Sequence, residues 1–180
     1  MADASIRVLP ALDDAPVDQI VDVYRDAFGA PGYDETPEDV ERFRTGLPRH
    51  AARDGFRLAL APADGGLVGF AYGYTGQPGQ WWTDRLLDRL PRDLTDVWVG
   101  GHFEFVELAV RPAAQRGGIG RALHDALLDG LPHRRALLGT WPDDRPARQL
   151  YLRAGWRVLA PIDDDRTLMG LELGNPRREG

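Results

Sequence analysis

The chain has 180 residues, of which 43% are hydrophobic and 28% are charged, and its formal net charge is −6. This composition is typical of one globular domain and unlike the basic surface of most nucleic-acid-binding proteins. Cysteine and lysine are absent, which excludes a thiolate nucleophile, a lysine Schiff base and a Walker-type phosphate loop. The single serine, Ser5, lies near the N-terminus, so a Ser-His-Asp hydrolase is not expected.

The first half of the chain predicts one short strand, two helices and a hairpin. Apolar residues three and four positions apart predict the helices, and alternating ones predict the strands. Thr36-Pro37-Glu38-Asp39 is a capping sequence with proline at the first helical position. The expected elements are a strand at Ile6–Leu9, a helix at Val17–Phe28 stopped by Gly29, a helix from Pro37 ended by Pro48, and strands at Phe56–Leu60 and Leu67–Thr75.

The second half predicts alternating strands and helices. The expected elements are a short helix bearing Trp82, Leu86 and Leu90, a strand at His102–Val110, a helix with a stripe from Ile119 to Leu131, a strand at Arg135–Thr140, a helix at Ala147–Ala154, and paired strands at Trp156–Ala160 and Thr167–Leu173. This order predicts an α/β (α+β mixed) fold with a mixed sheet and helices on both faces. We expect one domain over residues 1–174 and a mobile tail over residues 175–180.

A glycine-rich turn between the predicted strand His102–Val110 and the helix that follows it is the most informative segment. The chain runs from Leu108-Ala109-Val110 through Gln115-Arg116-Gly117-Gly118-Ile119-Gly120-Arg121 into an amphipathic helix. Free amides at a helix N-terminus bind anions, and glycine lets a phosphate approach the backbone. Arg116 and Arg121 would add positive charge. The alternative is a glycine-rich connection to a well-packed helix.

These residues resemble the GNAT superfamily of N-acetyltransferases. Gln115–Gly120 matches the family's Gln/Arg-x-x-Gly-x-Gly/Ala signature, and Ala147–Trp156 resembles its following helix, which usually closes with glycine and an aromatic residue. The resemblance implies a mostly antiparallel sheet of six to seven strands that splays at a cofactor cleft. It also implies direct transfer of an acetyl group from acetyl-CoA to a primary amine within a ternary complex.

The resemblance assigns acetyl-CoA to the glycine-rich turn and the strand before it. Backbone amides of the turn would hold the pyrophosphate, and an amide of the strand would receive the thioester carbonyl. The expected cofactor-binding residues are Leu108, Ala109, Val110, Gln115, Arg116, Gly117, Gly118, Ile119, Gly120 and Arg121.

Tyr151 is the predicted general acid. It lies four residues before Gly155, where the family usually places a tyrosine that faces the CoA sulfur, and a phenol is protonated at neutral pH. The alternative is a core tyrosine. Asp144 stands where many family members have asparagine, and we expect it to cap the helix.

Glu104 and Glu107 are the predicted bases. Both lie in an apolar strand, where burial raises the pKa of a carboxyl group. The spacing of Glu104 from Gln115 resembles that of the base in histone-type members, and Glu107 belongs to a Glu-Leu-Ala-Val sequence common in bacterial members. The alternative for either residue is a solvent-facing or ion-paired glutamate.

Trp81 and Trp82 are the predicted wall of the acceptor site, with core packing as the alternative. The acceptor is expected to be a cationic small-molecule amine, which the sequence does not name. A non-catalytic acyl-CoA-binding domain, a transferase for a longer acyl chain or an oxygen acceptor, and an interaction domain with an accidental motif stay open as alternatives. The oligomeric state stays open too, a homodimer included.

Localisation and other partners follow from what the sequence lacks. No apolar run approaches the roughly 18 residues of a membrane span, and no basic segment followed by an apolar one opens the chain. We therefore expect a cytoplasmic protein with no membrane and no nucleic-acid partner. The four histidines lack the close spacing of a metal site, so no metal is predicted.

Overall fold

A computed structural model describes residues 5–174. The chain forms two compact units, of which the first comprises Met1–Tyr74 and Glu107–Asp129 and the second Thr75–Val106 and Gly130–Gly180. The single domain expected over residues 1–174 stays a prediction, and the expected tail at 175–180 lies outside the described residues.

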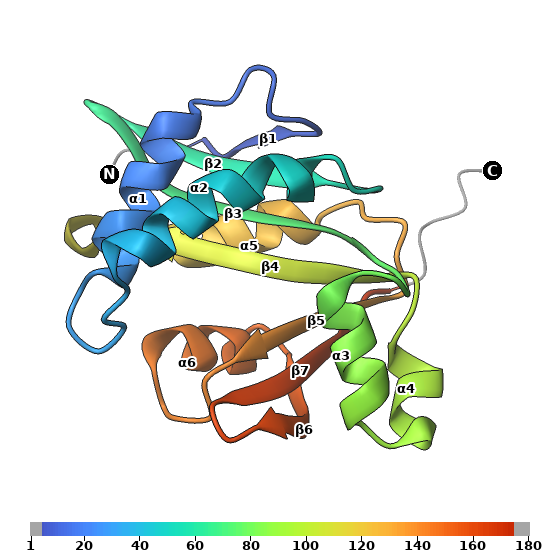
Figure 1. The fold of residues 1–180 in the computed structure, drawn as a ribbon. Helices are drawn as coiled ribbons and strands as arrows, with labels where there is room; N and C mark the ends of the chain where they lie inside the picture. Colours follow the sequence, from blue (N-terminus) through green and yellow to red (C-terminus); the bar gives the residue numbers. More distant parts are fainter. Residues whose placement is uncertain (1–4, 175–180) are drawn as a thin grey trace. The chain divides into compact units, whose positions relative to one another are not determined.

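The described chain contains seven strands, with helices between several of them in sequence up to β6 (Figure 1). The first unit contains β1 (Arg7–Leu9), α1 (Val17–Phe28), α2 (Pro37–Ala51), β2 (Arg57–Ala63), most of β3 (Gly66–Gly76), the second part of β4 (His102–Val110), the short 3₁₀ helix η1 (Pro112–Ala114) and α5 (Ile119–Leu128). The second unit contains the rest of β3 and β4, with α3 (Trp81–Arg89), α4 (Arg92–Trp98), β5 (Arg135–Thr140), α6 (Pro146–Arg153), β6 (Arg157–Asp163) and β7 (Arg166–Glu172).

The strands form one mixed sheet in the order β1-β2-β3-β4-β5-β7-β6. The pairs β1–β2, β2–β3, β5–β7 and β6–β7 are antiparallel. β4 and β5 are parallel, with Phe103 opposite Ala136 and Glu104 opposite Leu137. This confirms the predicted class, a mostly antiparallel mixed sheet of seven strands.

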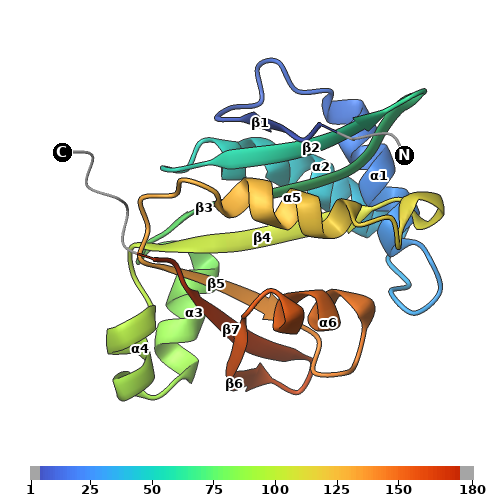
Figure 2. The same cartoon turned by 180° about the vertical axis from the view of Figure 1, so that it is seen from behind.

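The first unit has helices on both faces of its strands. Figures 1 and 2 show α1 and α2 on one face of β2 and β3, and α5 on the opposite face. The apolar stripe of α1 is buried as its spacing predicts, and each fully buried Leu or Ile side chain stabilises the fold by about 1.5–3 kcal/mol. The largest buried side chains of this unit include Ile20, Leu47, Leu58, Phe70, Tyr72, Tyr74, Leu123 and Leu127.

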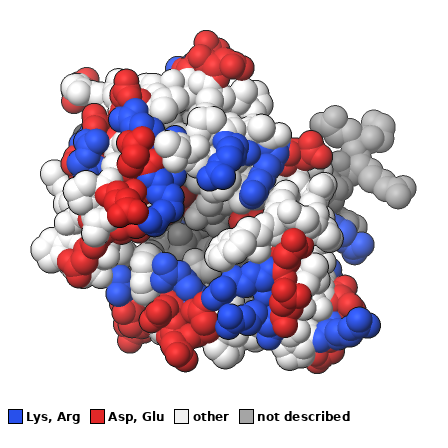
Figure 3. Space-filling view, viewed as in Figure 1, with Lys and Arg blue, Asp and Glu red and all other residues white. Residues whose placement is uncertain are grey.

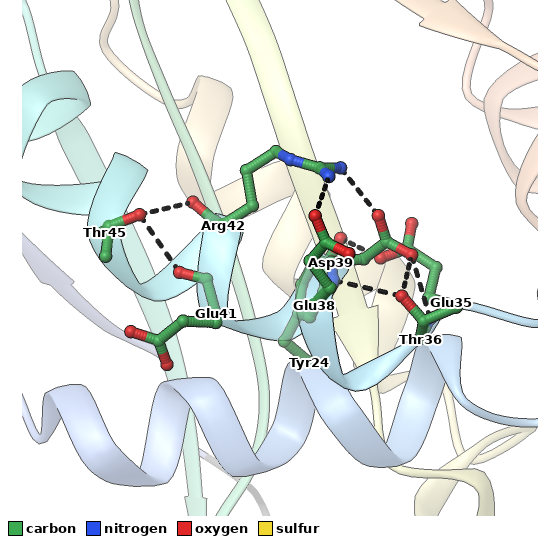
Figure 4. A network of polar contacts seen from close by, with 8 residues as sticks. All are labelled: Tyr24, Glu35, Thr36, Glu38, Asp39, Glu41, Arg42 and Thr45. Carbon is green, nitrogen blue, oxygen red and sulfur yellow. Dashed lines mark hydrogen bonds and ion pairs between the residues drawn. The ribbon is translucent and has the colours of Figure 1, made fainter.

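The start of α2 confirms the capping sequence, but its end does not follow the prediction. The amide of Asp39 donates to Thr36 Oγ1 at 3.3 Å, and the amide of Thr36 donates to Asp39 Oδ2 at 2.9 Å (Figure 4). The expectation that Pro48 ends the helix is wrong, because α2 continues to Ala51. His50 in this last turn makes a 2.9 Å hydrogen bond with the hydroxyl of Tyr72, a tertiary contact that a local pattern around Pro48 does not reveal.

The second unit packs α3 and α4 against the strands β5, β6 and β7. The core residues of this packing are Leu86, Leu90, Trp98, Leu137, Ile162 and Leu168. The sequence analysis missed α4, whose N-cap is Pro91 and whose length is only seven residues. Helix α5 also ends at Leu128, earlier than its apolar stripe suggested, and Leu131 is buried beyond the helix end.

No helix within residues 5–174 is both long enough and apolar enough to cross a membrane.

Gly170 provides a test of the packing in the second unit. A Cβ atom on Gly170 would lie 2.6 Å from Leu159 Cδ1 and 2.6 Å from Trp98 Cζ3. We expect Gly170→Ala to lower the free energy of unfolding by about 1–3 kcal/mol through overpacking. Gly139→Ala is the control, since its Cβ atom would meet Trp82 Cζ2 at 3.5 Å, an ordinary contact distance. Urea unfolding measures both, and equal stability of the two variants would contradict the packing described.

Candidate active site

The glycine-rich turn of the first unit joins the end of β4 to α5 in a conformation that leaves amides open. Arg116 and Gly118 both have positive φ, 66° and 82°, and Gly118 is the N-cap of α5. The first amide that closes the helix is that of Ala122, which donates to the carbonyl of Gly118 at 3.0 Å. The amides of Ile119 and Gly120 precede it and have no carbonyl one turn back to donate to, so they are available to an anion.

The space in front of this turn is open. A Cβ atom on Gly118 would have no heavy atom within 4 Å, and the side chains of Gln115 and Arg116 are exposed. Within the described part of the chain, Arg116 pairs with no carboxylate, whereas Arg121 pairs with Asp125 at 2.8 Å. The turn therefore offers backbone donors and one guanidinium without a carboxylate partner to a phosphate group.

Gln115 has a structural position within the turn. Its side-chain amide donates to the carbonyl of Val110 at 3.0 Å, which ties the turn back to the end of β4. The sequence analysis expected Gln115 among the cofactor-binding residues, and that role stays a prediction; the contact with Val110 shows a structural role for the same side chain.

Leu108, Ala109 and Val110 form the end of β4, the strand segment expected beside the cofactor. Ala109 is buried and its two neighbours are half-buried. A Cβ atom on Gly69 of β3 would lie 3.0 Å from the carbonyl oxygen of Ala109 and 3.0 Å from Leu123 Cδ1. Gly69 thus lets β3, β4 and α5 approach closely, a role that the sequence pattern did not indicate.

Glu107 shares the first unit with Tyr24 and Glu35, two residues that the sequence analysis did not propose. The hydroxyl of buried Tyr24 donates a hydrogen bond to the carboxylate of Glu35 (Figure 4). Burial raises the pKa of Tyr24 above its ordinary value, and the negative charges of Glu107 and Glu35 raise it further. Tyr24 is therefore protonated at neutral pH and acts as a donor.

Tyr151 of the second unit lies in an aromatic cluster. Its ring is 7% exposed and lies 5.9 Å from the rings of Phe105 and Trp156, edge-on to Phe105. The cluster would hold the ring in place both for a general acid and for a core tyrosine. The role of Tyr151 as general acid therefore stays a prediction.

The expectation that Asp144 caps α6 is wrong, because the N-cap is Arg145. The carboxylate of Asp144 instead accepts hydrogen bonds from Arg148 and Gln149 at 3.3 Å. The carboxylate thus contacts side chains of the helix rather than the free amides of its first turn.

Glu104, Trp81 and Trp82 also belong to the second unit, where their environments differ. Glu104 is 5% exposed. Trp82 packs against the core of α3 and α4, whereas Trp81 is 71% exposed, with the guanidinium of Arg85 5.5 Å from its ring. Trp82 therefore fits the core interpretation better than Trp81 does.

His102 is a buried polar residue of the same unit. It is 2% exposed, and its Nδ1 accepts a hydrogen bond from the amide of Gly100 at 3.1 Å. A Cβ atom on Gly76 would lie 2.2 Å from Nε2 of this ring, so only glycine fits opposite it. Burial and, to a smaller degree, the charge of His133 lower the pKa of His102 to about 4, so the ring is neutral at pH 7.

A family model described as the acetyltransferase (GNAT) family matches residues 17–156. The chain belongs to the GNAT acetyltransferase family. A GCN5-like protein acetyltransferase from Mycobacterium tuberculosis is 38% identical over 120 residues, which are 62% of this chain and 54% of that protein. The chain therefore spans about half the length of this relative.

Solved structures share the GNAT fold with this chain. PaiA N-acetyltransferase from Thermoplasma acidophilum, solved in complex with coenzyme A, has a TM-score of 0.64 at 15% identity and covers 94% of this chain and 99% of its own. An acetyltransferase from Thermus thermophilus has a TM-score of 0.65 at 18% identity and covers 93% and 97%. At these identities the likeness concerns the fold alone.

In this GNAT chain each unit contains part of the expected set of residues. The first unit brings together the glycine-rich turn, the end of β4 and Glu107, and adds Tyr24 and Glu35. The second unit contains Tyr151, Glu104, Trp81 and Trp82. No group of three or more His, Cys, Asp or Glu side chains among residues 5–174 is placed to hold a metal ion.

The pKa of His102 makes stability depend on pH. Its folded value of about 4 lies below the ordinary 6.5, so the unfolded chain binds a proton between these pH values that the folded chain does not. Stability is therefore lost as the pH falls from 6.5 towards 4. We expect His102→Asn, which keeps an acceptor for Gly100, to reduce the loss between pH 7.5 and pH 4.5 by roughly 2 kcal/mol.

Urea unfolding at the two pH values measures this difference between variant and wild type. An NMR titration of the wild-type ring is the independent check. A ring that titrates near pH 6.5, or a variant with an unaltered loss of stability, would contradict the buried neutral histidine.

Proposed function

We propose that this protein transfers an acetyl group from acetyl-CoA to a primary amine by direct attack in a ternary complex. The open turn at Gln115–Gly120, at the N-terminus of a helix, carries the proposal, because it offers unsatisfied amides to a diphosphate. Membership of the GNAT acetyltransferase family supports acyl transfer as the chemistry.

The first unit would bind the co-substrate. The amides at Arg116–Gly120 and the helix dipole would hold the pyrophosphate, with Arg116 and Arg121 as cationic neighbours. The backbone of Leu108–Val110 would run beside the pantetheine arm, and one of its amides would stabilise the negative charge that develops on the thioester oxygen. A relative of the same fold was solved with coenzyme A, which supports an acyl-CoA as the donor.

Direct attack needs two proton movements. The amine must lose a proton before or as it attacks the carbonyl carbon, and the departing CoA sulfur must gain one. We assign the first to Glu107 or Glu104 and the second to Tyr151. No enzyme nucleophile is required, in agreement with a chain that lacks cysteine and has one serine.

The acceptor in this proposal is a small cationic amine. The named relative with 38% identity is a protein acetyltransferase, so an amine on a protein is the second candidate. An acceptor screen with thiol release as the readout, run on small amines and on peptides, separates the two.

Gly120→Asp tests the binding of acetyl-CoA. Wild type should gain about 2.7 kcal/mol of stability at free ligand near 100 times the dissociation constant. The variant places a side chain and a negative charge beside the diphosphate, so the gain should disappear. Thermal unfolding with and without acetyl-CoA measures the gain. Ala52→Asp, on an exposed position at the end of α2, adds the same charge elsewhere in the unit and should keep it.

An unfolding temperature of folded wild type that does not change with saturating acetyl-CoA would overturn the proposed function.

Tyr151→Phe tests the general acid. The substitution removes the proton donor and keeps the ring that packs on Phe105 and Trp156. We expect turnover to fall about 10²–10⁴-fold while the affinity for acetyl-CoA stays within twofold. Tyr74→Phe removes another buried hydroxyl and should leave turnover near wild type. Wild-type turnover of Tyr151→Phe, measured where chemistry limits the rate, would leave Tyr151 with a core role only.

A further inference from the structure

The second unit contains an open cavity of about 580 Å³. Residues from α3, from the end of β5 and from the turn between β6 and β7 line it, and all of them belong to this unit. The lining residues are Arg85, Arg89, Trp141, Asp163, Asp164, Asp165 and Arg166. Figure 3 shows arginine and acidic side chains intermixed over the face of the unit that carries α3 and β6. The proposed function assigns no role to these side chains.

One ion pair forms a wall of the cavity. Asp163 Oδ2 accepts a hydrogen bond from the guanidinium of Arg85, and Asp163 Oδ1 accepts one from the amide of Asp165 at 3.0 Å. The side chains of Arg85 and Asp163 are 29% and 25% exposed. Both oxygens of Asp163 are therefore engaged, and its charge is balanced by that of Arg85. This pair ties the turn between β6 and β7 to α3.

Arg166 is held against an aromatic ring at the same cavity. Its guanidinium carbon lies 4.0 Å from the centroid of Trp141, and its Nη1 donates to the carbonyl of Asp165 at 3.2 Å. Arg166 is half-buried and, among residues 5–174, forms no ion pair with a carboxylate. A guanidinium has five N–H donors in a planar fork. The ring thus orients a cation that keeps donors for a ligand.

Arg89 provides a second guanidinium without a partner. It lies in the last turn of α3 and is exposed. Within the described part of the chain its side chain forms neither a hydrogen bond nor an ion pair, unlike that of Arg85 one turn earlier. Planar guanidinium forks match the oxygen atoms of carboxylates and phosphates. Two such groups at one cavity therefore favour an oxyanion as the ligand.

Asp164 and Asp165 act against an anion, but their effect is the smaller one. Both are exposed at the tip of the turn, where water and salt screen their charges. A like charge in such surroundings weakens binding by about fivefold or less. A hydrogen bond between charged groups strengthens binding by about tenfold or more. The donors of Arg89 and Arg166 together therefore outweigh the two carboxylates.

We propose that this cavity binds a small ligand through a carboxylate or phosphate group, which Arg89 and Arg166 hold. Trp141 is a positioning residue, because it orients the guanidinium of Arg166. The turn at Gln115–Gly120 belongs to the first unit, whereas the whole cavity belongs to the second. The inference therefore goes beyond the proposed function and does not depend on it.

The test follows the indole N–H resonance of Trp141 in a proton–nitrogen correlation spectrum. The chain has five tryptophans, and Trp141→Phe identifies the resonance by its loss. We expect inorganic phosphate or succinate to shift this resonance to saturation, and sodium chloride at the same ionic strength to leave it in place. The lower of the two dissociation constants identifies phosphate or carboxylate as the preferred group.

Four variants test the charges around the cavity. Arg166→Gln and Arg89→Gln should each weaken binding of the preferred anion about tenfold. Arg166→Lys keeps the charge but loses the planar fork, so it should weaken binding about threefold. Asp164→Asn removes a repelling charge and should strengthen binding about twofold. Arg92→Gln is the matched control, an exposed arginine of the same unit outside the cavity, and should bind like wild type.

The positioning role of Trp141 needs a different readout, because its variants lack the indole reporter. Titration calorimetry on protein saturated with CoA measures anion binding in these variants. Trp141→Leu removes the aromatic face and should weaken binding about fivefold. Trp141→Phe keeps an aromatic face under Arg166 and should stay within about twofold of wild type. Equal losses in the two variants would contradict the positioning role.

Several results would overturn the inference. A Trp141 resonance that neither anion shifts would do so, and so would an equal shift with sodium chloride. Affinity within twofold of wild type in both Arg89→Gln and Arg166→Gln, with the other indole resonances unchanged, would exclude the two arginines. Loss of the anion on saturation with CoA would assign the cavity to the cofactor site instead. A protein that binds an anion here but no acetyl-CoA would reject the proposed function and leave this inference standing.

Discussion

The exit of the chain from β4 is the constraint on which the anion-binding turn depends. The amide of Arg111 donates to the carbonyl of Val68 at 2.8 Å, and Nε of the same residue donates to the carbonyl of Leu67 at 2.9 Å. The guanidinium also forms an ion pair with Asp26 of α1. One arginine therefore joins β3, β4 and α1 at the point where the turn begins, and Gln115 closes the turn onto the carbonyl of Val110.

This anchoring explains why the amides at the start of α5 can stay open. A helix N-terminus without partners is costly unless water or a ligand satisfies it. Because the turn is held from behind by Arg111 and Gln115, its front needs no protein contacts to keep its shape. The positive φ of Arg116 and Gly118 then directs backbone donors outward, at the strain that a non-glycine residue at this φ entails.

Local signals in the sequence predicted a large part of the fold. The capping sequence at Thr36 and the apolar run at His102–Val110 depend on neighbours in the chain, and both elements lie where they were expected. The last turn of α2, beyond Pro48, is tied to β3 by the hydrogen bond between His50 and Tyr72, which lie 22 positions apart in the sequence. The requirement for glycine at Gly69 is of the same kind, because it arises from β4 and α5. No pattern in one stretch of sequence contains such information.

The same distinction, between signals within one segment and contacts between distant segments, applies to the candidate site. The turn at Gln115–Gly120 could be predicted because one segment contains all its chemistry. Glu107 could be proposed from its strand, but its relation to Tyr24 and Glu35 could not, since Glu35 lies eleven residues after Tyr24 in an irregular segment. The sequence offered only a weak signal for the contact between Tyr24 and Glu35. Glu35 directly precedes the N-cap residue of a helix, where several nearby groups can pair with a carboxylate.

The absence of lysine determines which cations can pair with the carboxylates of the first unit. Every cation that pairs with the carboxylates of α2 is an arginine, whose guanidinium stays protonated and does not act as an amine nucleophile at neutral pH. A lysine at such a position could compete with an external acceptor, either by occupying the carboxylates or by accepting the acetyl group itself. In this chain the internal cations neutralise the surface of α2 without offering an ε-amine. Among the described residues, the carboxylate of Glu35 forms none of these ion pairs and accepts a hydrogen bond from the hydroxyl of Tyr24.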